Sequence, residues 1–420
     1  MSFSLPEIKL GHPDSAIRLA SAVHRFRVPK VTSSVSFARS FQTSGSHPTT
    51  KSALLQADIF RQQLMDAVNA VPMSGERVYN EASRYLPLID QLLLTCKVQP
   101  EVARLDERLI FEWTSGVEKN ATPFTSEALM YDLVMVCACQ ALGKTSIATE
   151  ASISGDFAVA AREYAFAAGI FEFLAKDHLP KWIAKGNVLT DKLPMEVTVA
   201  TSEAFVELFL ANGQQMAIAS VLIKPGEPNY SLVAKLCLGV VERLESFISL
   251  MRKNAFDLMS RMDKEIFSLI AIQIALQKSL SMYFYARALW ESMDYGLAIA
   301  TLSEALKGLA TRSSAAGSGI PDIPKTSPLF ALNKDLTDLK AHMTMLLKYY
   351  EKDNSTVYFE PVPLKVPEDK KLQTALQLTK CTPYTMVPRD PLPLSLSDGG
   401  YKRSDSDLAR QLHEQLNSGN

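Results

Sequence analysis

The residues of this chain that could do chemistry are few, and the first candidate is a phosphate-binding loop ending at Gly143-Lys144-Thr145. Such a loop needs a second glycine five residues earlier, because the backbone N–H groups of a glycine-rich turn surround the phosphates. That earlier position is Ala138, and the run before it has the pattern of a helix rather than of a strand. The sequence therefore predicts no nucleotide site here.

The histidines, acidic pairs and cysteines also lack the spacing of a catalytic or metal site. The six histidines are scattered, and no HExxH, GxSxG or GxGxxG motif occurs. Glu242 and Glu245 are one helical turn apart, and such pairs usually lie on a solvent-exposed face. Cys137 and Cys139 are separated by one residue, which is not the CxxC spacing of a metal or redox site. We therefore expect no catalytic residues, no metal and no cofactor, and the chain is predicted not to be an enzyme.

Charge and composition indicate a cytoplasmic protein. The chain has 44 Lys+Arg and 45 Asp+Glu, a net charge of -1, so no overall positive field would attract nucleic acid or an anionic membrane. The odd count of 5 cysteines fits a reducing compartment. No window of about 18 uncharged apolar residues predicts a transmembrane segment. The last residues, 416–420, form no prenylation box. Any contact with a membrane is therefore expected to be indirect.

Between about residues 51 and 352, apolar residues recur every three or four positions, which predicts a mainly helical protein. Breaks such as Lys224 to Pro228 are short, so successive helices are expected to be antiparallel. The region 264–311 resembles a tetratricopeptide-type hairpin. A β-prone patch at Val31 to Phe37 is the one clear strand signal. The expected helices are 53–71, 79–97, 125–142, 157–176, 195–223, 229–262, 264–292, 294–311 and 327–352.

The two ends of the chain differ from this helical region. Residues 1–27 are expected to form a flexible arm, although interleaved basic residues also resemble a weak organellar presequence. Seven of the 22 prolines lie between Pro361 and Pro393, which favours extended chain lying over a surface. In the segment Asp407 to Leu416, leucines are spaced four residues apart. This segment is interpreted either as a short docking helix or as a frayed tail. The basic residues near the N-terminus are Arg18, His24, Arg25, Arg27 and Lys30.

The helix expected from Asn229 to Met251 has an unusually broad apolar face. At about 100° per residue, its apolar side chains fill an arc of about 180°, where a surface helix needs only about 100°. The more common explanation is that the helix lies between two neighbours. The other explanation is that one edge of the arc is an exposed groove for an amphipathic, acidic helix. Leu232 and Leu236 lie at this edge, and Arg243 is expected to project between them.

Several motifs, taken together, resemble the Bro domain, the fold shared by Alix, rhophilin and Brox. Their number, order and spacing over residues 28–380 carry the resemblance, which is strongest to the Brox subtype. The matching stretches are Val28 to Phe37, Ala167 to Leu174 with His178 to Lys181, Leu210 to Gln215, Ser231 to Leu236, Gly296 to Leu302, and Asp353 to Pro363.

This resemblance implies a fold class and a division of the chain. The fold would be all-α with a small N-terminal β element, arranged as a curved, boomerang-shaped helical solenoid with a tetratricopeptide-like core. The Bro domain would cover residues 28–380. The arm 1–27 would precede it, and a proline-containing extended tail, 381–420, would follow it.

The resemblance also implies a partner, the C-terminal amphipathic helix of an ESCRT-III subunit of the Snf-seven or charged multivesicular body protein four class. The family's apolar contact residues correspond to Leu232 and Leu236, with Val233 beside them. Ala217 falls where some members carry phenylalanine, which is expected to weaken the apolar patch. Tyr283 corresponds to a surface tyrosine of some members, although from the sequence alone it is expected to be packed.

The leading hypothesis is a non-enzymatic adaptor of the ESCRT pathway, cytoplasmic and recruited peripherally to endosomes. A second hypothesis keeps the Bro fold but gives it another protein partner, bound through the tail 381–420, and Ala217 favours it. A third is an all-helical enzyme, which the missing acid–base and metal motifs disfavour.

Overall fold

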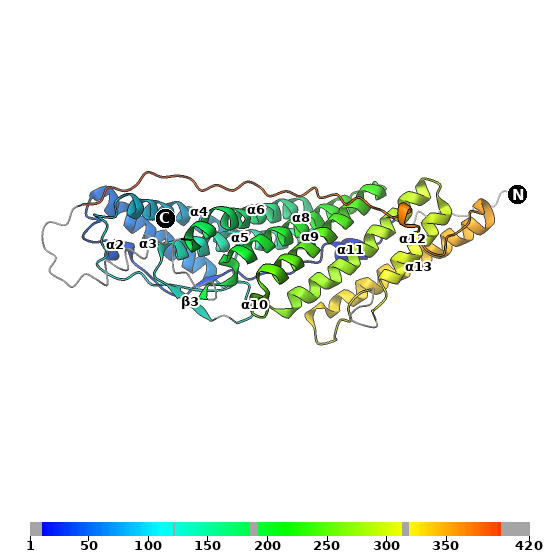
Figure 1. Ribbon diagram of the computed structural model, residues 1–420, viewed down its shortest axis with the longest axis horizontal. Helices are drawn as coiled ribbons and strands as arrows, with labels where there is room; N and C mark the ends of the chain where they lie inside the picture. The colour runs from blue at the N-terminus through cyan, green and yellow to red at the C-terminus, as the bar shows by residue number, and fades with distance from the viewer. Residues whose placement is uncertain (1–10, 121, 185–191, 313–318, 396–420) are drawn as a thin grey trace.

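Long helices lie side by side, largely in chain order, and form an elongated, curved row (Figure 1). The structure is a computed structural model and describes residues 11–120, 122–184, 192–312 and 319–395. The predicted all-α, boomerang-like solenoid is confirmed. Its longer helices are α3 (Pro48–Asn69), α4 (Gly75–Val98), α5 (Leu129–Ile153), α6 (Phe157–Phe173), α8 (Val199–Leu222), α9 (Tyr230–Asn254), α11 (Lys264–Glu291), α12 (Tyr295–Gly308) and α13 (Leu332–Asp353). The shorter ones are α1 (Asp14–Ala20), α2 (Phe37–Ser40), α7 (Leu179–Ile183) and α10 (Phe256–Met259).

A small antiparallel sheet lies near one end of the row, with strand order β1-β2-β3. The strands are β1 (Lys30–Val31), β2 (Phe111–Thr114) and β3 (Pro123–Ser126), and Trp113 is paired with Phe124. Only β1 coincides with the predicted β-prone patch. The other two strands lie inside the region expected to have almost no strands. Each has four residues, which is too few for a period-2 pattern to stand out in the sequence.

A buried ion pair joins α3 to α5 beside this sheet. The guanidinium of Arg61 donates to both carboxylate oxygens of Asp132, each at 3.2 Å. The hydroxyl of Tyr85 on α4 donates to the same carboxylate at 2.7 Å, and the indole N–H of Trp113 on β2 donates at 2.8 Å. A buried charge is tolerated when its hydrogen bonds are satisfied, as they are here. Asp132 therefore connects three helices and the sheet.

The N-terminal segment packs against the helices from residue 11 onward, which corrects the expectation of a flexible arm for residues 11–27, while residues 1–10 lie outside the described residues. Helix α1 buries Ala16, Leu19 and Ala20 against the core. Buried glutamines of α8 and α11 explain why it stays there, because their side-chain amides donate to its backbone carbonyls. Gln273 donates to Leu19 at 3.0 Å and to Ala22 at 2.8 Å. In the sequence these glutamines are indistinguishable from solvent-exposed ones.

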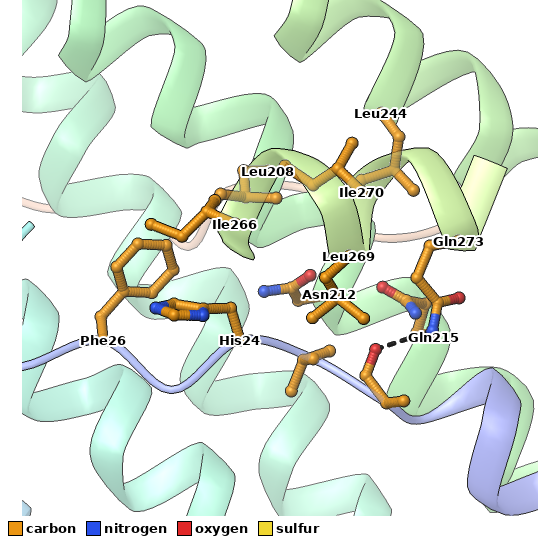
Figure 2. Close-up of a pocket in the computed structure, with 12 residues that line it drawn as sticks. His24, Phe26, Leu208, Asn212, Gln215, Leu244, Ile266, Leu269, Ile270 and Gln273 are labelled. Carbon is orange, nitrogen blue, oxygen red and sulfur yellow. Dashed lines mark hydrogen bonds between the residues drawn. The ribbon is translucent and has the colours of Figure 1, made fainter. Parts of the chain in front are cut away.

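After α1, the chain continues between α8 and α11 (Figure 2). His24 and Phe26 face Leu208 and Asn212 of α8 and Ile266 of α11, around a cavity of about 10 Å³. Such a space is at the lower limit for holding one water molecule. We therefore regard the cavity as part of the packing and not as a ligand site.

An extended segment, residues 361–395, runs along the upper edge of the row in Figure 1, and we call it the strap. This agrees with the extended chain predicted from its prolines. Its backbone forms hydrogen bonds with α9, with α6 and with the turn before α3: Leu376 N with Lys235 O, Thr382 N with Ala165 O, and Ser395 N with Ser44 O. The contacts continue without interruption beyond residue 380. The remaining predicted tail, 396–420, including its possible leucine helix, lies outside the described residues.

By length and composition two helices could cross a membrane, although charged residues interrupt the apolar sequence of each. They are Val199–Leu222 and Lys264–Glu291, which are α8 and α11. In each, most of the apolar window is buried inside the protein, 72% and 61% respectively. Both helices are central members of the row, where neighbours cover them on several sides, so their apolar composition is explained by the core.

Candidate functional site

The predicted site lies on the hairpin of α8 and α9. Each helix begins with a capping side chain: Thr198 accepts from the N–H of Thr201, and Asn229 accepts from that of Leu232 at 2.9 Å. The side-chain amide of Gln214 on α8 donates to Leu236 O on α9 at 2.7 Å. This contact fixes the position of the two antiparallel helices relative to each other along their axes. Ala217 lies one turn further along α8 and Leu232 one turn earlier on α9. These two residues are therefore close to the same level.

The structure separates the two leucines that were expected to line the groove together. Leu232 is 36% exposed, whereas Leu236 is 1% exposed and Val233 is fully buried. Ala217 is half-buried. Burial of the inner side chains shows that most of the broad apolar arc exists because α9 is packed between α8 and α11. The apolar surface available to a partner at this level is therefore Leu232 with Ala217, which we call the Leu232 surface.

Arg243 does not project between the leucines. It is two to three turns further along α9, 7% exposed, and its guanidinium contacts Glu207 on α8 at 3.0 Å. The same side chain donates to the backbone oxygen of Thr379 at 2.9 Å. Arg243 thus holds the strap onto the α8–α9 hairpin. The position of Arg243 around the helix axis was predicted correctly. Helical periodicity could not show that the strap crosses α9 at this residue.

Tyr283 is an interior residue and not a surface tyrosine. Its side chain is fully buried, its hydroxyl lies 3.1 Å from His342 Nε2, and Arg287 donates to it at 3.4 Å. Burial raises the pKa of Tyr283. Burial also lowers the pKa of His342 to about 4, so this imidazole is neutral near pH 7. These contacts join α11 to α13, and the packed alternative expected from the sequence is the correct one.

Three glycines allow the strap to lie directly on the helices. A Cβ atom at Gly169 would be 1.9 Å from Thr382 O, one at Gly239 would be 2.2 Å from Leu376 O, and one at Gly296 would be 2.3 Å from Pro361 O. The role of these glycines as seats for extended chain was not predicted from the sequence. The signal available was a set of helix-interior glycines together with a proline-rich C-terminal segment.

The strap also brings side chains to the face of the row. The ring of Tyr384 packs edge-on against Phe166 and Phe173 of α6. Gln377 donates to Glu242 of α9 at 2.9 Å, and Leu378, one residue further on, is 53% exposed. The Leu232 surface therefore lies close to a crossing of extended chain and helix, and the strap forms part of its surroundings.

One acid with a raised pKa, Glu196, is buried away from this surface. The carboxylate of Glu196 accepts from the hydroxyl of Ser115 at 2.6 Å and from the N–H of Gly116 at 2.8 Å. Burial raises the pKa of Glu196 to about 7. Among the described residues, no group of three or more His, Cys, Asp or Glu is arranged to hold a metal ion. At the Leu232 surface itself, the exposed leucine offers apolar contact to a partner.

Comparison with known families gives one match that covers most of the chain. The model of the family described as "BRO1-like domain" matches residues 36–395. This range ends at the last described residue of the strap, so the family pattern includes the extended segment as well as the helices. No curated protein sequence matches the chain.

Solved structures with the same fold share little sequence with this chain. A structure described as "ALIX BRO1 CHMP4C complex" is 19% identical with a TM-score of 0.64, covering 86% of this chain and 96% of that one. "Structure basis for endosomal targeting by the Bro1 domain" is 17% identical with a TM-score of 0.67, covering 94% and 97%. ALIX in complex with the SIVmac239 PYKEVTEDL late domain is 16% identical with a TM-score of 0.65, covering 92% and 51%.

Proposed function

The chain belongs to the family of BRO1-like domains, and from this premise we propose that it is a non-enzymatic adaptor of the ESCRT pathway. It would bind the C-terminal amphipathic helix of an ESCRT-III subunit of the Snf-seven or CHMP-four class. The observation that carries the proposal is the family match over residues 36–395, together with a structure of the same fold described as a complex with CHMP4C. On this proposal the protein acts in the cytoplasm without a cofactor and reaches endosomal membranes through its partner.

We place the docking site at the Leu232 surface. Leu232 is the exposed member of the predicted pair, and the half-buried Ala217 lies at about the same level on α8. Because Ala217 adds little apolar area, we expect modest affinity that depends on few contacts. A single helix also buries less surface than a stable protein–protein interface of standard size.

Binding of a C-terminal helix peptide of CHMP4C to the purified chain tests the proposal. Leu232→Asp should weaken binding about tenfold or more, because a charge would face the apolar side of the peptide. Leu55→Asp is the matched control, since Leu55 is a 47% exposed leucine on the distant helix α3. Leu236→Asp is unsuitable, because it would place a charge in the core and unfold the protein.

A gain-of-binding variant makes the test sharper. Ala217→Phe enlarges the apolar surface, and we expect the affinity for the same peptide to rise several-fold. If the folded parent chain does not bind even at high peptide concentration, the ESCRT-III proposal fails. The alternative is then a Bro-fold scaffold with a different protein partner. Its docking segment would be 396–420 rather than 381–395, because the strap already packs 381–395 against the helices.

A further inference from the structure

A second hollow lies between the C-terminal half of α9 and the N-terminal half of α11. It is an open groove of about 710 Å³ whose apolar floor consists of Ile248, Met259, Phe267, Ala271 and Ile274. Phe267, Ala271 and Ile274 are at i, i+4 and i+7 of α11, so they form one stripe along that helix. The stripe faces Ile248 and Ser249 of α9. We propose that this α9–α11 groove binds a short, acidic amphipathic helix of a partner protein.

The shape of the groove follows from small side chains between large ones. Ala271 and Ser249 leave the centre of the floor low, whereas Phe267, Ile248 and Ile274 are partly buried and present their outer faces to the groove. The floor on α11 spans seven residues, or about 10 Å. That length accommodates two apolar side chains of a docked helix, one turn apart.

The charges at the rim select the partner. Arg252 and Lys253 are exposed in the last turn of α9, and neither forms an ion pair within the described part of the chain. The one carboxylate that lines the groove, Glu245, contacts Lys278 Nζ at 2.7 Å and is thereby neutralised. Asp263, at the start of α11, is not among the residues that line the groove. The charged side chains of the lining are therefore Arg252, Lys253 and the paired Glu245, so the lining is net positive and complementary to an acidic helix.

The α9–α11 groove is separate from the Leu232 surface. Ile248 and Leu232 are sixteen residues apart on α9, which corresponds to about 24 Å. The strap crosses α9 between them, where Leu376 bonds to Lys235 and lies over Gly239. One partner could therefore occupy each surface at the same time. The inference does not rest on the proposed ESCRT-III function.

The test uses the full chain with isotope-labelled isoleucine and methionine methyl groups and three synthetic helical peptides. One has leucines at i, i+3 and i+7 among glutamates, the second replaces glutamate by lysine, and the third replaces leucine by serine. We expect the acidic leucine peptide alone to shift the methyl signals of Ile248, Met259 and Ile274. Absence of these shifts at millimolar peptide, or equal shifts with the lysine peptide, would overturn the proposal.

Two variants localise the binding. Ala271→Arg fills the floor and should reduce affinity for the acidic peptide at least tenfold, with Ser249→Arg as a second variant in case the first does not fold. The double variant Arg252→Glu, Lys253→Glu should reverse the preference toward the lysine peptide. Lys334→Glu, Lys340→Glu on α13 is the matched charge control, and Leu232→Asp should leave the peptide-induced shifts of Ile248, Met259 and Ile274 unchanged. Retained binding in the folded floor variants would refute the assignment of this groove.

Discussion

Asp132 is the residue on which the buried polar contacts of α3, α4, α5 and β2 converge. Arg61, Tyr85 and Trp113 all donate to its carboxylate. Asp132→Ala would leave the Arg61 guanidinium buried without its counter-charge. We expect the free energy of unfolding to fall by about 3–5 kcal/mol. Denaturation with urea, followed by circular dichroism, measures this change.

The control for Asp132 is an exposed ion pair. Asp335→Ala removes the contact with Arg18, whose side chain is 54% exposed, and such pairs contribute less than about 1 kcal/mol. Equal effects of the two substitutions would contradict the role assigned to Asp132. Both variants remove one carboxylate, so a change in net charge cannot explain a difference between them.

Glu196 gives the protein a specific dependence on pH. Burial raises its pKa in the folded state from the usual 4.5 to about 7, so between these values the folded state holds a proton that the unfolded state has lost. The contribution of Glu196 to stability therefore falls as pH rises from 4.5 to 7, by up to about 3 kcal/mol. Glu196→Gln should flatten this part of the stability profile.

Unfolding measured at several pH values between 4.5 and 8 tests this prediction. The difference in unfolding free energy between Glu196→Gln and the parent should move in favour of the variant as pH rises. A difference that stays constant over this range would show that Glu196 titrates normally in the folded protein. His342, whose folded-state pKa is lowered to about 4, acts with the opposite sign. Because the variant keeps His342, its contribution cancels in the comparison.

At the scale of single residues, the sequence predicted part of the candidate site. The helical wheel placed Leu232 at the edge of the apolar arc, and that side chain is indeed exposed. It placed Leu236 at the same edge, yet Leu236 is buried because α8 covers it at the level of Gln214. Arg243 was assigned to a partner, but it contacts Thr379 of the chain itself. Periodicity gives the angle of a side chain and not the identity of its neighbour.

The strap lies directly on the helices at glycines, so its attachment depends on these positions having no side chain. Gly169→Ala would bring a Cβ atom against the backbone oxygen of Thr382 and displace the strap there. The helix itself would gain about 1 kcal/mol from the exchange, so global stability should change little. We expect amide hydrogen exchange at Thr382, which donates to Ala165 O, to become about tenfold faster.

A second glycine provides the comparison. Gly143→Ala makes the same chemical change within a helix, but its Cβ would meet no atom closer than 3.3 Å and would not touch the strap. Exchange at Thr382 should stay at the parent rate in this variant. If Gly169→Ala also leaves that rate unchanged, the close approach at Gly169 does not hold the strap.

Among the elements, the long helices were predicted well, and the short or unusual ones were not. Helices such as α11 contain several turns, so the 3.6-residue period repeats often enough to be recognised. The strands β2 and β3 have four residues each, and α1 has seven, which is too short for a periodic signal. The docking of α1 depends on Gln215, Gln273 and Gln277, whose partners are backbone carbonyls far away in the sequence.

For the whole molecule, the N-terminal segment from residue 11 onward packs as part of the core. Phe26 packs edge-on against Phe205 and Phe209 of α8 and is 4% exposed. Phe26→Ala should therefore lower the free energy of unfolding by about 3–5 kcal/mol. Thermal unfolding of the purified protein measures the loss.

Phe256→Ala is the control, since Phe256 on α10 is 70% exposed and its removal should change stability by less than about 0.5 kcal/mol. A loss of less than about 1 kcal/mol in Phe26→Ala would indicate that the segment is dispensable. That result would restore the presequence interpretation, because a cleaved leader cannot be part of the mature core.

The strap has a consequence for how the protein is made. Its last described residues bind the first long helix and the turn before it: Thr50 donates to Pro393 O across 343 positions of sequence, and Ser395 N donates to Ser44 O. A ribosome needs about 20 to 80 s to synthesise 420 residues, at typical rates of elongation. Until the strap has been synthesised, the seats at Gly169 and Gly239 and the rings of Phe166 and Phe173 are without their cover. We therefore expect nascent chains to expose apolar surface of the kind that chaperones bind until the strap packs onto the helices.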